Sequence, residues 1–416
     1  MSLRRLACDV LRRVLGGAFA APVLDAALSR SQAAPQERGF TTDLVYGTLR
    51  HAVLLEACLA PHLRSPERLP HAAKSILLLG SYEVLIRQTP RWAAVYEWVA
   101  VAKTQAPKLS GLVNAVLRRV ALPDNPTLAQ QAGVPEWLYA YWQAQFGAAT
   151  AHEIGQAMLE PEPLWLTSYH QAAAASLAAE GATVTPGPLP GSLAVRPAKP
   201  LAAHEAFRRG WVQPQNPASR LPTWLLAPQP GERVLDLCSG SGIKAAEIAY
   251  AGAEPVSIEL MPAKLAAAKK NLARLGLKAE HHSYDLRQVP PLEPAAKVLL
   301  DAPCSGTGTL RGNPEIRLRV TEEAIKELAA LQRQLLATAG ELTAPGGTLV
   351  YAVCALTPDE GDEVVAAALA RYPELRADRL SLPLPYRATD HGAVVLPVEG
   401  LDGFYLARLV KDPQVS

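Results

Sequence analysis

The stretch RVLDLCSGSGIKAAEIAYAGAEPVSIEL, residues 233–260, carries the pattern that decides the fold of this chain. A short apolar run ends at Asp236, passes through a turn that contains Gly240 and Gly242, and leads into a helical segment. A second apolar run follows and ends at Glu259. Two apolar runs of strand length with a helix between them predict parallel strands joined by a crossover, the repeating unit of an α/β sheet.

The same alternation continues from this stretch to the C-terminus. Further strands are expected at 298–300 and 348–353, and long helices at 263–275 and 322–342. Apolar runs that alternate with helical patterns indicate a parallel sheet with helices on both faces. The sequence therefore predicts a Rossmann-like, doubly wound α/β domain over residues 221–416.

Two different patterns precede this domain. Residues 131–220 contain short alternating runs, one helical segment and a Pro/Gly cluster, which predicts a linker and a small α+β domain. Residues 1–130 form one apolar stripe of helical spacing after another, interrupted by prolines, which predicts an all-α bundle. The expected fold class is multidomain, with an all-α bundle, a small α+β insert and a Rossmann-like α/β domain.

Composition limits the class of protein. Of the 416 residues, 49% are hydrophobic and 19% are charged, a balance typical of packed globular proteins. The chain has no apolar run of the ~18 residues that span a membrane, and its first residues show no secretory cleavage site. Five cysteines are too few for a disulfide scaffold. We expect a cytoplasmic protein without a membrane segment, and a monomer.

Charge is unevenly distributed along the chain. The net charge is only +2, yet residues 1–120 hold 16 Lys and Arg against 8 Asp and Glu. A basic N-terminal third on a slightly acidic body is typical of a module that faces a polyanion. It is equally typical of a helical domain with a solvated basic surface, so charge alone leaves both interpretations open.

Reactive side chains gather where the predicted strands end. In open α/β sheets, ligands bind beyond the carboxyl ends of the strands. Six acidic or thiol side chains stand at or just after these ends: Asp236, Glu259, Asp285, Asp301, Cys304 and Cys354. One acid there is most often a helix cap, but a whole series indicates a functional site. Cys8 and Cys58 are expected in the helical core, and His281 and His282 lack the spacing of a zinc site, so no metal is expected.

The glycine turn after the first strand predicts a nucleoside site. Glycines let the backbone approach a ligand closely, and a carboxylate about 20 residues later, here Glu259, accepts from ribose hydroxyls. The turn lacks the Lys-Ser/Thr pair of a P-loop and the full dinucleotide pattern G-x-G-x-x-G. It admits S-adenosylmethionine, whose adenosine needs the same contacts without a pyrophosphate.

Several motifs resemble those of one family. DAPCSGTG at 301–308 is similar to the signature of the Sun-type RNA cytosine-5 methyltransferases. CSGSGIK at 238–244 resembles the family's first cofactor motif, and LVYAVC at 349–354 resembles its nucleophile strand. Residues 402–411 resemble its closing strands. The resemblance implies methyl transfer from S-adenosylmethionine to cytosine C5, through a covalent bond between a cysteine and C6.

The N-terminal region is similar to the NusB-like RNA-binding domain fused to bacterial members of the family. The similarity lies at YGTLR, residues 46–50, and NAVLR, residues 114–118. This domain order implies 16S (small-subunit) ribosomal RNA as the partner and substrate. Transfer RNA or another RNA is the alternative substrate. The alternative from another class is a non-catalytic RNA-binding or ribosome assembly factor.

The resemblance also implies roles for individual residues. Cys354 would be the nucleophile, Cys304 would assist release of the product, and Asp301 would hold the edge of the base and help to protonate N3. Glu259 would contact the ribose and Asp285 the adenine side. The other cofactor contacts would come from the loop and from the acid of the signature: Cys238, Ser239, Gly240, Ser241, Gly242, Ile243, Lys244 and Asp301.

Several positions depart from the family's pattern, among them Ser239, Gly240 and Ser241 of the cofactor loop and the segment 213–219. Ile243 places a β-branched side chain where the family has glycine, Glu259 is one methylene longer than the usual Asp, and Val353 replaces the Thr before the nucleophile. Each change keeps the reactive groups, so activity is still expected. Arg311 and Arg317, which follow the signature, are candidates for phosphate contacts or for a solvated helix face.

Overall fold

Two compact units make up the chain in the computed structural model. The helical unit comprises Met1–Pro161 with Leu310–Arg319, and the sheet unit comprises Glu162–Thr309 with Val320–Ser416. The described residues are 2–31, 33–161 and 163–413. The three-domain division at residues 130 and 220 stays a prediction.

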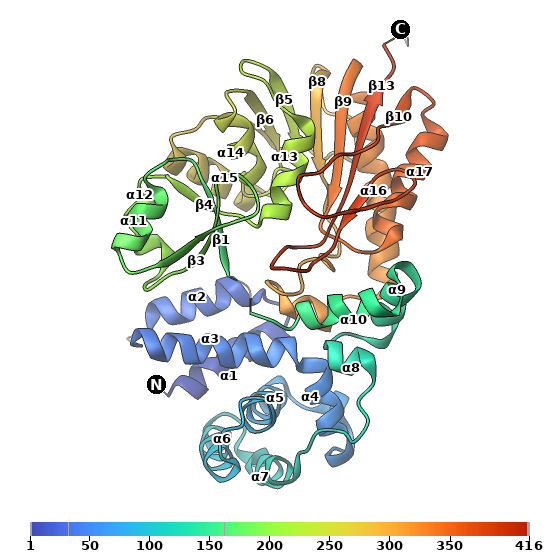
Figure 1. The fold of residues 1–416 in the computed structure, drawn as a ribbon. Helices are drawn as coiled ribbons and strands as arrows, with labels where there is room; N and C mark the ends of the chain where they lie inside the picture. Colours follow the sequence, from blue (N-terminus) through green and yellow to red (C-terminus); the bar gives the residue numbers. More distant parts are fainter. Residues whose placement is uncertain (1, 32, 162, 414–416) are drawn as a thin grey trace. The chain divides into compact units, whose positions relative to one another are not determined.

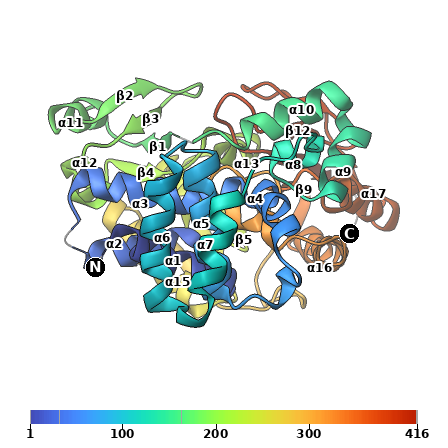
Figure 2. The same cartoon turned by 90° about the horizontal axis from the view of Figure 1, so that it is seen from below.

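The helical unit confirms the expected all-α bundle (Figures 1 and 2). Its core includes the fully buried Trp98 and the buried Cys8 and Cys58, as expected. The first helix shows how the pattern works: Ser2 caps it by accepting from the N–H of Arg5. The α-helices of this unit are α1 (Leu3–Leu15), α2 (Ala20–Arg30), α3 (Pro35–Arg50), α4 (Ala52–Leu59), α5 (His71–Leu85), α6 (Arg91–Gln105), α7 (Ser110–Arg119), α8 (Leu128–Ala132), α9 (Glu136–Phe146) and α10 (Ala148–Ala157).

A short segment from the second half of the chain completes the helical unit. Leu310–Arg319 follows directly on the DAPCSGTG signature, yet it packs with the helical unit. The buried carboxylate of Glu315 accepts from the backbone N–H of Ala20, at the start of α2, at 2.9 Å. A carboxylate at a helix N-terminus satisfies a free N–H and favours the helix dipole. The segment is therefore an integral part of the bundle.

The prediction that Arg311 and Arg317 contact phosphates is wrong. Their exposed fractions are 4% and 1%, so neither lies on a solvated face. Burial lowers the pKa of Arg317 to about 9. Its guanidinium is used inside the helical unit, where it donates to the carbonyl oxygens of Arg50, Met158 and Leu310.

The sheet unit confirms the Rossmann-like fold. Its described residues form a nine-stranded sheet in the order β11-β12-β13-β9-β8-β5-β6-β7, with β10 paired to β13. Strands β9, β8, β5, β6 and β7 are parallel. The strands are β5 (Arg233–Leu237), β6 (Glu254–Ile258), β7 (Glu280–His282), β8 (Ala295–Asp301), β9 (Thr343–Val353), β10 (Leu375–Ala377), β11 (Arg387–Ala388), β12 (Ala393–Val395) and β13 (Phe404–Lys411).

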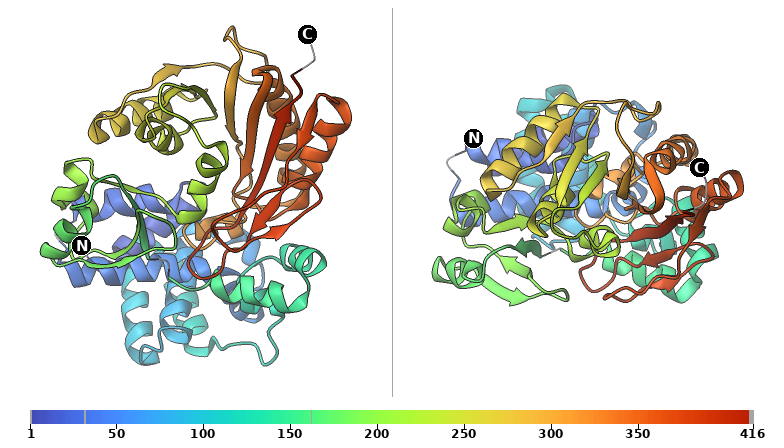
Figure 3. Two further views of the ribbon diagram at one scale, coloured as in Figure 1. Left: turned by 45° about the horizontal axis from the view of Figure 1, so that its top comes forward. Right: turned by 90° about the horizontal axis from the view of Figure 1, so that it is seen from above.

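Helices cover both faces of this sheet (Figures 1 and 3). The strand order runs outward from β5 in both directions, and right-handed crossovers then place the connecting helices on opposite faces. One set comprises α13 (Leu221–Leu226), α14 (Ile243–Tyr250) and α15 (Pro262–Leu275). The other comprises α16 (Glu322–Glu341) and α17 (Asp362–Arg371).

The sheet is mixed, whereas the sequence pattern predicted a parallel one. β13 runs antiparallel to both β9 and β12. A parallel connection needs a crossover of about a dozen residues or more. Only residues 396–403 separate β12 from β13, so the chain turns back as a hairpin there.

A second, smaller sheet in this unit matches the expected α+β pattern. It is antiparallel, with strand order β2-β3-β1-β4. Its elements are β1 (Leu164–Ser168), α11 (Ala173–Ala179), β2 (Thr183–Pro186), β3 (Ser192–Arg196), α12 (Glu205–Arg208) and β4 (Val212–Pro214).

Across the described ranges, no helix is both long and apolar enough to cross a membrane. The described side chains also include no group of three or more His, Cys, Asp or Glu residues that could hold a metal ion. His281 and His282 lie half-buried in β7, the edge strand of the large sheet.

Candidate active site

Four neighbouring strands bring most of the predicted site residues to one edge of the large sheet. The strand order along this edge is β9, β8, β5 and β6. Cys354 follows β9, Asp301 ends β8, Cys238 follows β5 and Glu259 follows β6. Adjacent strands lie about 4.8 Å apart, so these positions span about 15 Å. That distance suits a nucleoside lying beside a second nucleobase.

The loop between β5 and α14 leaves its backbone open to a ligand. Cys238, Gly240 and Gly242 have φ angles of +59°, +57° and +75°. A non-glycine residue in this left-handed region is strained, and such strain concentrates at functional sites. A Cβ added to Gly240 would have only the carbonyl oxygen of Cys238 within 4.0 Å. A ligand can therefore approach the loop closely.

The pKa of Cys238 does not favour a nucleophilic thiolate. Burial, together with the carboxylates of Glu259, Asp301 and Asp236, raises the pKa of Cys238 to about 12. The thiol therefore stays protonated at neutral pH.

Glu259 is held against the same loop. Its Oε2 accepts from the N–H of Gly240 at 3.0 Å, and its Oε1 accepts from the N–H of Met261 at 2.8 Å. These bonds fix the longer side chain, while each oxygen keeps a lone pair for a ribose hydroxyl. The open loop and this positioned carboxylate fit the adenosine part of S-adenosylmethionine.

A cluster of charges lies between the loop and the end of β8. The Nζ of Lys244 lies 2.5 Å from Oδ2 of Asp301. Burial opposes the charge of Lys244, but Asp301 and Asp236 outweigh it and raise the pKa of Lys244. Asp236 is 1% exposed, and its oxygens form no hydrogen bond of normal geometry with the described residues. Burial, with Asp301 and Glu259, raises the pKa of Asp236 to about 7.

Asp236 should make the free energy of unfolding depend on pH. Because its pKa is raised from an ordinary 3.8 to about 7, its stabilising contribution is complete below pH 4 and is lost as the pH rises through 7. This difference corresponds to at most roughly 4 kcal/mol. Asp236→Asn should remove that loss, which urea unfolding at pH 5 and pH 8 would measure. An equal pH dependence in both proteins would contradict the assignment.

Two thiols face each other at the ends of β8 and β9. The Sγ atoms of Cys304 and Cys354 lie 3.2 Å apart, and both cysteines are free. The hydrogen bond to Cys354, followed by burial, raises the pKa of Cys304 well above its ordinary value. Either thiol could be the donor in this contact, and the raised pKa of Cys304 favours its protonated form. The N–H of Gly308 donates to the carbonyl of Cys354 at 2.9 Å, which ties the two loops together.

Glu360 is a residue of this site that the sequence analysis missed. It is 0% exposed, and its carboxylate accepts from the N–H and Oγ of Ser305 at 2.7 and 2.6 Å. It also accepts from Thr357 at 2.7 Å and from Gln332 at 3.2 Å. The spacing Thr357-x-x-Glu360 matches a capping box, and this spacing is the feature of the sequence that could have drawn attention to Glu360. Here the side chain instead fixes the residue next to Cys304.

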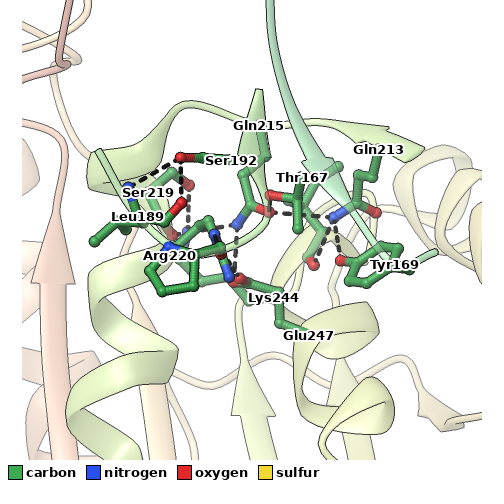
Figure 4. A network of polar contacts seen from close by, with 12 residues as sticks. Thr167, Tyr169, Leu189, Ser192, Gln213, Gln215, Ser219, Arg220, Lys244 and Glu247 are labelled. Atoms are coloured by element: carbon green, nitrogen blue, oxygen red, sulfur yellow. Dashed lines mark hydrogen bonds and ion pairs between the residues drawn. The ribbon is translucent and has the colours of Figure 1, made fainter. Parts of the chain in front are cut away.

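A polar network links the small sheet to the cofactor loop (Figure 4). Gln215 accepts from Thr167 at 2.8 Å and donates to Glu247 of α14 at 2.8 Å. Glu247 also pairs with Arg220 at 2.9 Å. Gln213 donates to the carbonyl of Ile243 at 3.1 Å, which fixes the first residue of α14. This network holds the helix that carries Lys244.

Asp285 is one of the predicted residues that these contacts do not include. Within the described chain, its hydrogen bonds go to Arg287, at 2.6 to 3.0 Å, and not to the glycine loop. The Arg287 guanidinium, together with its backbone N–H, lowers the pKa of Asp285. A contact to the adenine side of a cofactor stays a prediction.

Comparison with known proteins agrees with this geometry. Residues 223–410 match the family model "16S rRNA methyltransferase RsmB/F", and residues 1–122 match the NusB family. The chain is 44% identical to the ribosomal RNA small subunit methyltransferase B of Thermus thermophilus, over 98% of this chain and 97% of that protein. It is 35% identical to the protein of the same name from Pseudomonas putida, over 90% and 91%.

A solved structure shows the same fold. The crystal structure of PH0851 superposes with a TM-score of 0.87 at 22% identity, covering 99% of both chains. The family model and the two relatives define the class of protein, an S-adenosylmethionine-dependent methyltransferase of RNA, and the strand-end site agrees with it. The chain belongs to the family of ribosomal RNA small-subunit methyltransferases of the RsmB/F type, with an N-terminal NusB domain.

Proposed function

We propose that this enzyme methylates C5 of a cytosine in 16S ribosomal RNA, with Cys354 as a covalent nucleophile. The observation that carries the proposal is the thiol pair, with Cys304 Sγ 3.2 Å from Cys354 Sγ, one strand away from the pair formed by Asp301 and Lys244. We propose that it acts in the cytoplasm as a monomer, and without a metal.

The first step uses the thiolate of Cys354. C5 of cytosine is a poor nucleophile until a bond forms between Sγ and C6. The electrons of the C5–C6 double bond then move towards N3, where a proton is needed. Asp301 lies at the end of the adjacent strand, and its Oδ2 lies 2.5 Å from the Nζ of Lys244. This pair would hold the base edge and supply a proton near N3.

When bound, S-adenosylmethionine would supply a methyl group: the bond from its sulfonium to that methyl would break as C5 gains it, and the cofactor would leave as a neutral thioether. The open backbone at Gly240 and the carboxylate of Glu259 would hold the adenosine, two and three strands away from Cys354. The target cytosine must leave its stack to reach this edge of the sheet.

The last step restores the aromatic ring. A base removes the C5 proton, the electron pair of that C–H bond forms the C5–C6 double bond again, and the bond between C6 and Sγ breaks with its electron pair returning to Cys354. N3 gives its proton back to the pair formed by Asp301 and Lys244. The Sγ of Cys304 lies within hydrogen-bond distance of the leaving sulfur, and the raised pKa of Cys304 would keep the proton on this thiol. It would stabilise the departing thiolate. Glu360 would act as a positioning residue by fixing Ser305 beside it.

Glu259→Ala should weaken binding of S-adenosylmethionine about 10- to 100-fold. The variant loses the ribose acceptor and frees the N–H groups of Gly240 and Met261. Isothermal titration calorimetry measures this loss, and Glu280→Ala on the neighbouring strand β7 serves as the control. Unchanged affinity in Glu259→Ala would place the ribose elsewhere.

The proposed function is tested with labelled S-adenosylmethionine and 16S ribosomal RNA from cells that lack the enzyme. Digestion to nucleosides should yield labelled 5-methylcytidine. Label in another nucleoside would overturn the C5 assignment, and label in transfer RNA alone would overturn the substrate. No transfer to either RNA, with no cofactor bound, would favour a non-catalytic assembly factor.

A further inference from the structure

The helical unit has a groove that lies outside the active site. It is about 820 Å³ in volume and lies along α6 and α7. Figure 2 shows these two helices side by side. Six of its side chains carry the argument that follows: Arg91, Trp92, Tyr96, Lys103, Asn114 and Arg118.

One wall of the groove exposes aromatic rings. Trp92 and Tyr96 are 79% and 74% exposed, more than any other large hydrophobic side chain in the described residues. They stand one turn apart on α6, so they lie on the same face of the helix. The opposite face of α6 buries Ala94, Val95 and Trp98 in the core. The helix therefore needs neither exposed ring for its own packing.

The two walls are fixed relative to each other. Arg91, at the first residue of α6, donates to the carbonyls of Leu117 and Val120 at 2.9 and 2.8 Å. These carbonyls belong to the C-terminal end of α7, so the bonds cap that helix and lock the groove. Aromatic platforms on a rigid support bind with little loss of conformational entropy.

The groove is bordered by positive charge. Lys103 lies on the same exposed stripe of α6 as the rings, and Arg118 is exposed on α7. In the described chain neither forms an ion pair. Residues 91–120 contain one acidic residue, Glu97, and its carboxylate lies 3.6 Å from the guanidinium of Arg4 in α1. The distance along α6 from Trp92 to Lys103 is about 16 Å.

We propose that this groove binds a single-stranded segment of the substrate RNA, with unpaired bases stacked on Trp92 and Tyr96. Lys103 and Arg118 contact its phosphates, and the carboxamide of Asn114 offers a donor and an acceptor to a base edge. The inference rests on the proposed function for the identity of the RNA. It adds a second contact, on the NusB-like unit, that is independent of the methyl-transfer site.

The charge and the rings favour unpaired RNA over other partners. Bases in a duplex are stacked on each other, so exposed aromatic rings cannot reach their faces. A protein partner would be expected to cover an apolar patch ringed by both signs of charge. Here the unpaired charges beside the rings are cations, which match phosphates.

The test measures binding by fluorescence anisotropy, with the full-length protein and no cofactor. The probe is a fluorescein-labelled single-stranded RNA of about 12 nucleotides, compared with the same RNA annealed to its complement. The double variant Trp92→Ala/Tyr96→Ala should raise the Kd for the single strand about 10- to 100-fold. Its effect on the duplex should be at most about twofold. The matched control is Trp224→Ala/Tyr250→Ala, which removes the same residue types at 54% and 55% exposure.

A second readout tests the charges. Lys103→Ala and Arg118→Ala should each flatten the slope of log Kd against log salt by about 0.7. An unchanged Kd in the Trp92/Tyr96 variant, or an equal loss in the control, would overturn the inference. Unchanged RNA binding with altered sedimentation would instead identify a protein-docking surface.

The outcomes separate this inference from the proposed function. When the rate is measured over a range of 16S RNA concentrations, the Trp92/Tyr96 variant should keep its kcat and show a raised KM. If the wild-type protein binds the single strand through these rings but transfers no methyl group, the proposed reaction is wrong and the RNA-binding role of the groove is supported. If methyl transfer occurs and the loss of the rings does not change the Kd, the RNA-binding role of the groove is wrong and the proposed reaction is unaffected.

Discussion

Cys354→Ala should lower the rate of methyl transfer to 16S ribosomal RNA by about 10⁴-fold or more. The expected loss is large because alanine leaves no group that can bond to C6. Without that bond, the hydrogen bonds from Asp301 and Lys244 to the base cannot make C5 reactive enough to accept the methyl group. Cys354 also lies beside a thiol whose own pKa is raised, so Cys304 is a poor substitute. Single-turnover assays with labelled cofactor measure the loss.

The matched control for this variant is Cys58→Ala. Cys58 is also a cysteine but lies in the helical core, 3% exposed, so its loss should leave the rate within about twofold. Binding of S-adenosylmethionine should be unchanged in Cys354→Ala, which shows that the fold is intact. A residual rate within tenfold of the wild type would refute Cys354 as the nucleophile.

Cys304→Ala should have the second largest effect, and of a different kind. We expect the first covalent step to proceed, while the missing thiol slows departure of the sulfur, so that turnover falls about 10²- to 10⁴-fold. The enzyme should then accumulate as an adduct with RNA. Denaturing gel electrophoresis with labelled RNA detects it as a slowly migrating band.

The double variant Cys304→Ala/Cys354→Ala separates the two thiols. It should give no adduct, because the sulfur that forms the bond is absent. An adduct that persists in the double variant would assign the nucleophile to another residue. Multiple turnover at the wild-type rate in Cys304→Ala would exclude a role in release.

The strand ends were the most predictable part of the molecule. Asp236, Glu259, Asp301 and Cys354 could be placed on one edge because the period of the pattern fixes where strands end, and parallel strands end together. Local spacing carried this information. The direction of β13 was not predictable in this way, since it depends on which strand β13 pairs with in the folded sheet, and local spacing does not contain that information.

Contacts between distant side chains were also beyond the sequence. The carboxylate of Glu360 bonds Ser305, which lies 55 residues earlier in the chain. The pairing of Lys244 with Asp301 likewise links two motifs that lie far apart in the sequence. Lys244 was expected to belong to the cofactor loop, and Asp301 was expected to contact the base. Arg317 looked like a surface cation, because nothing near it in the sequence indicates that distant carbonyls surround it. Such partners become visible only when the fold brings them together.

The return of Leu310–Arg319 to the helical unit has a consequence for biosynthesis. A ribosome delivers the N-terminal residues first, yet this bundle lacks one of its own pieces until residue 319 has been made. At about 5–20 residues per second, the wait after Pro161 lasts roughly 10–30 s. Over that interval the carbonyls of Arg50 and Met158 have no guanidinium, and Ala20 has no carboxylate. The nascent bundle should stay sensitive to proteases until the catalytic signature has left the exit tunnel.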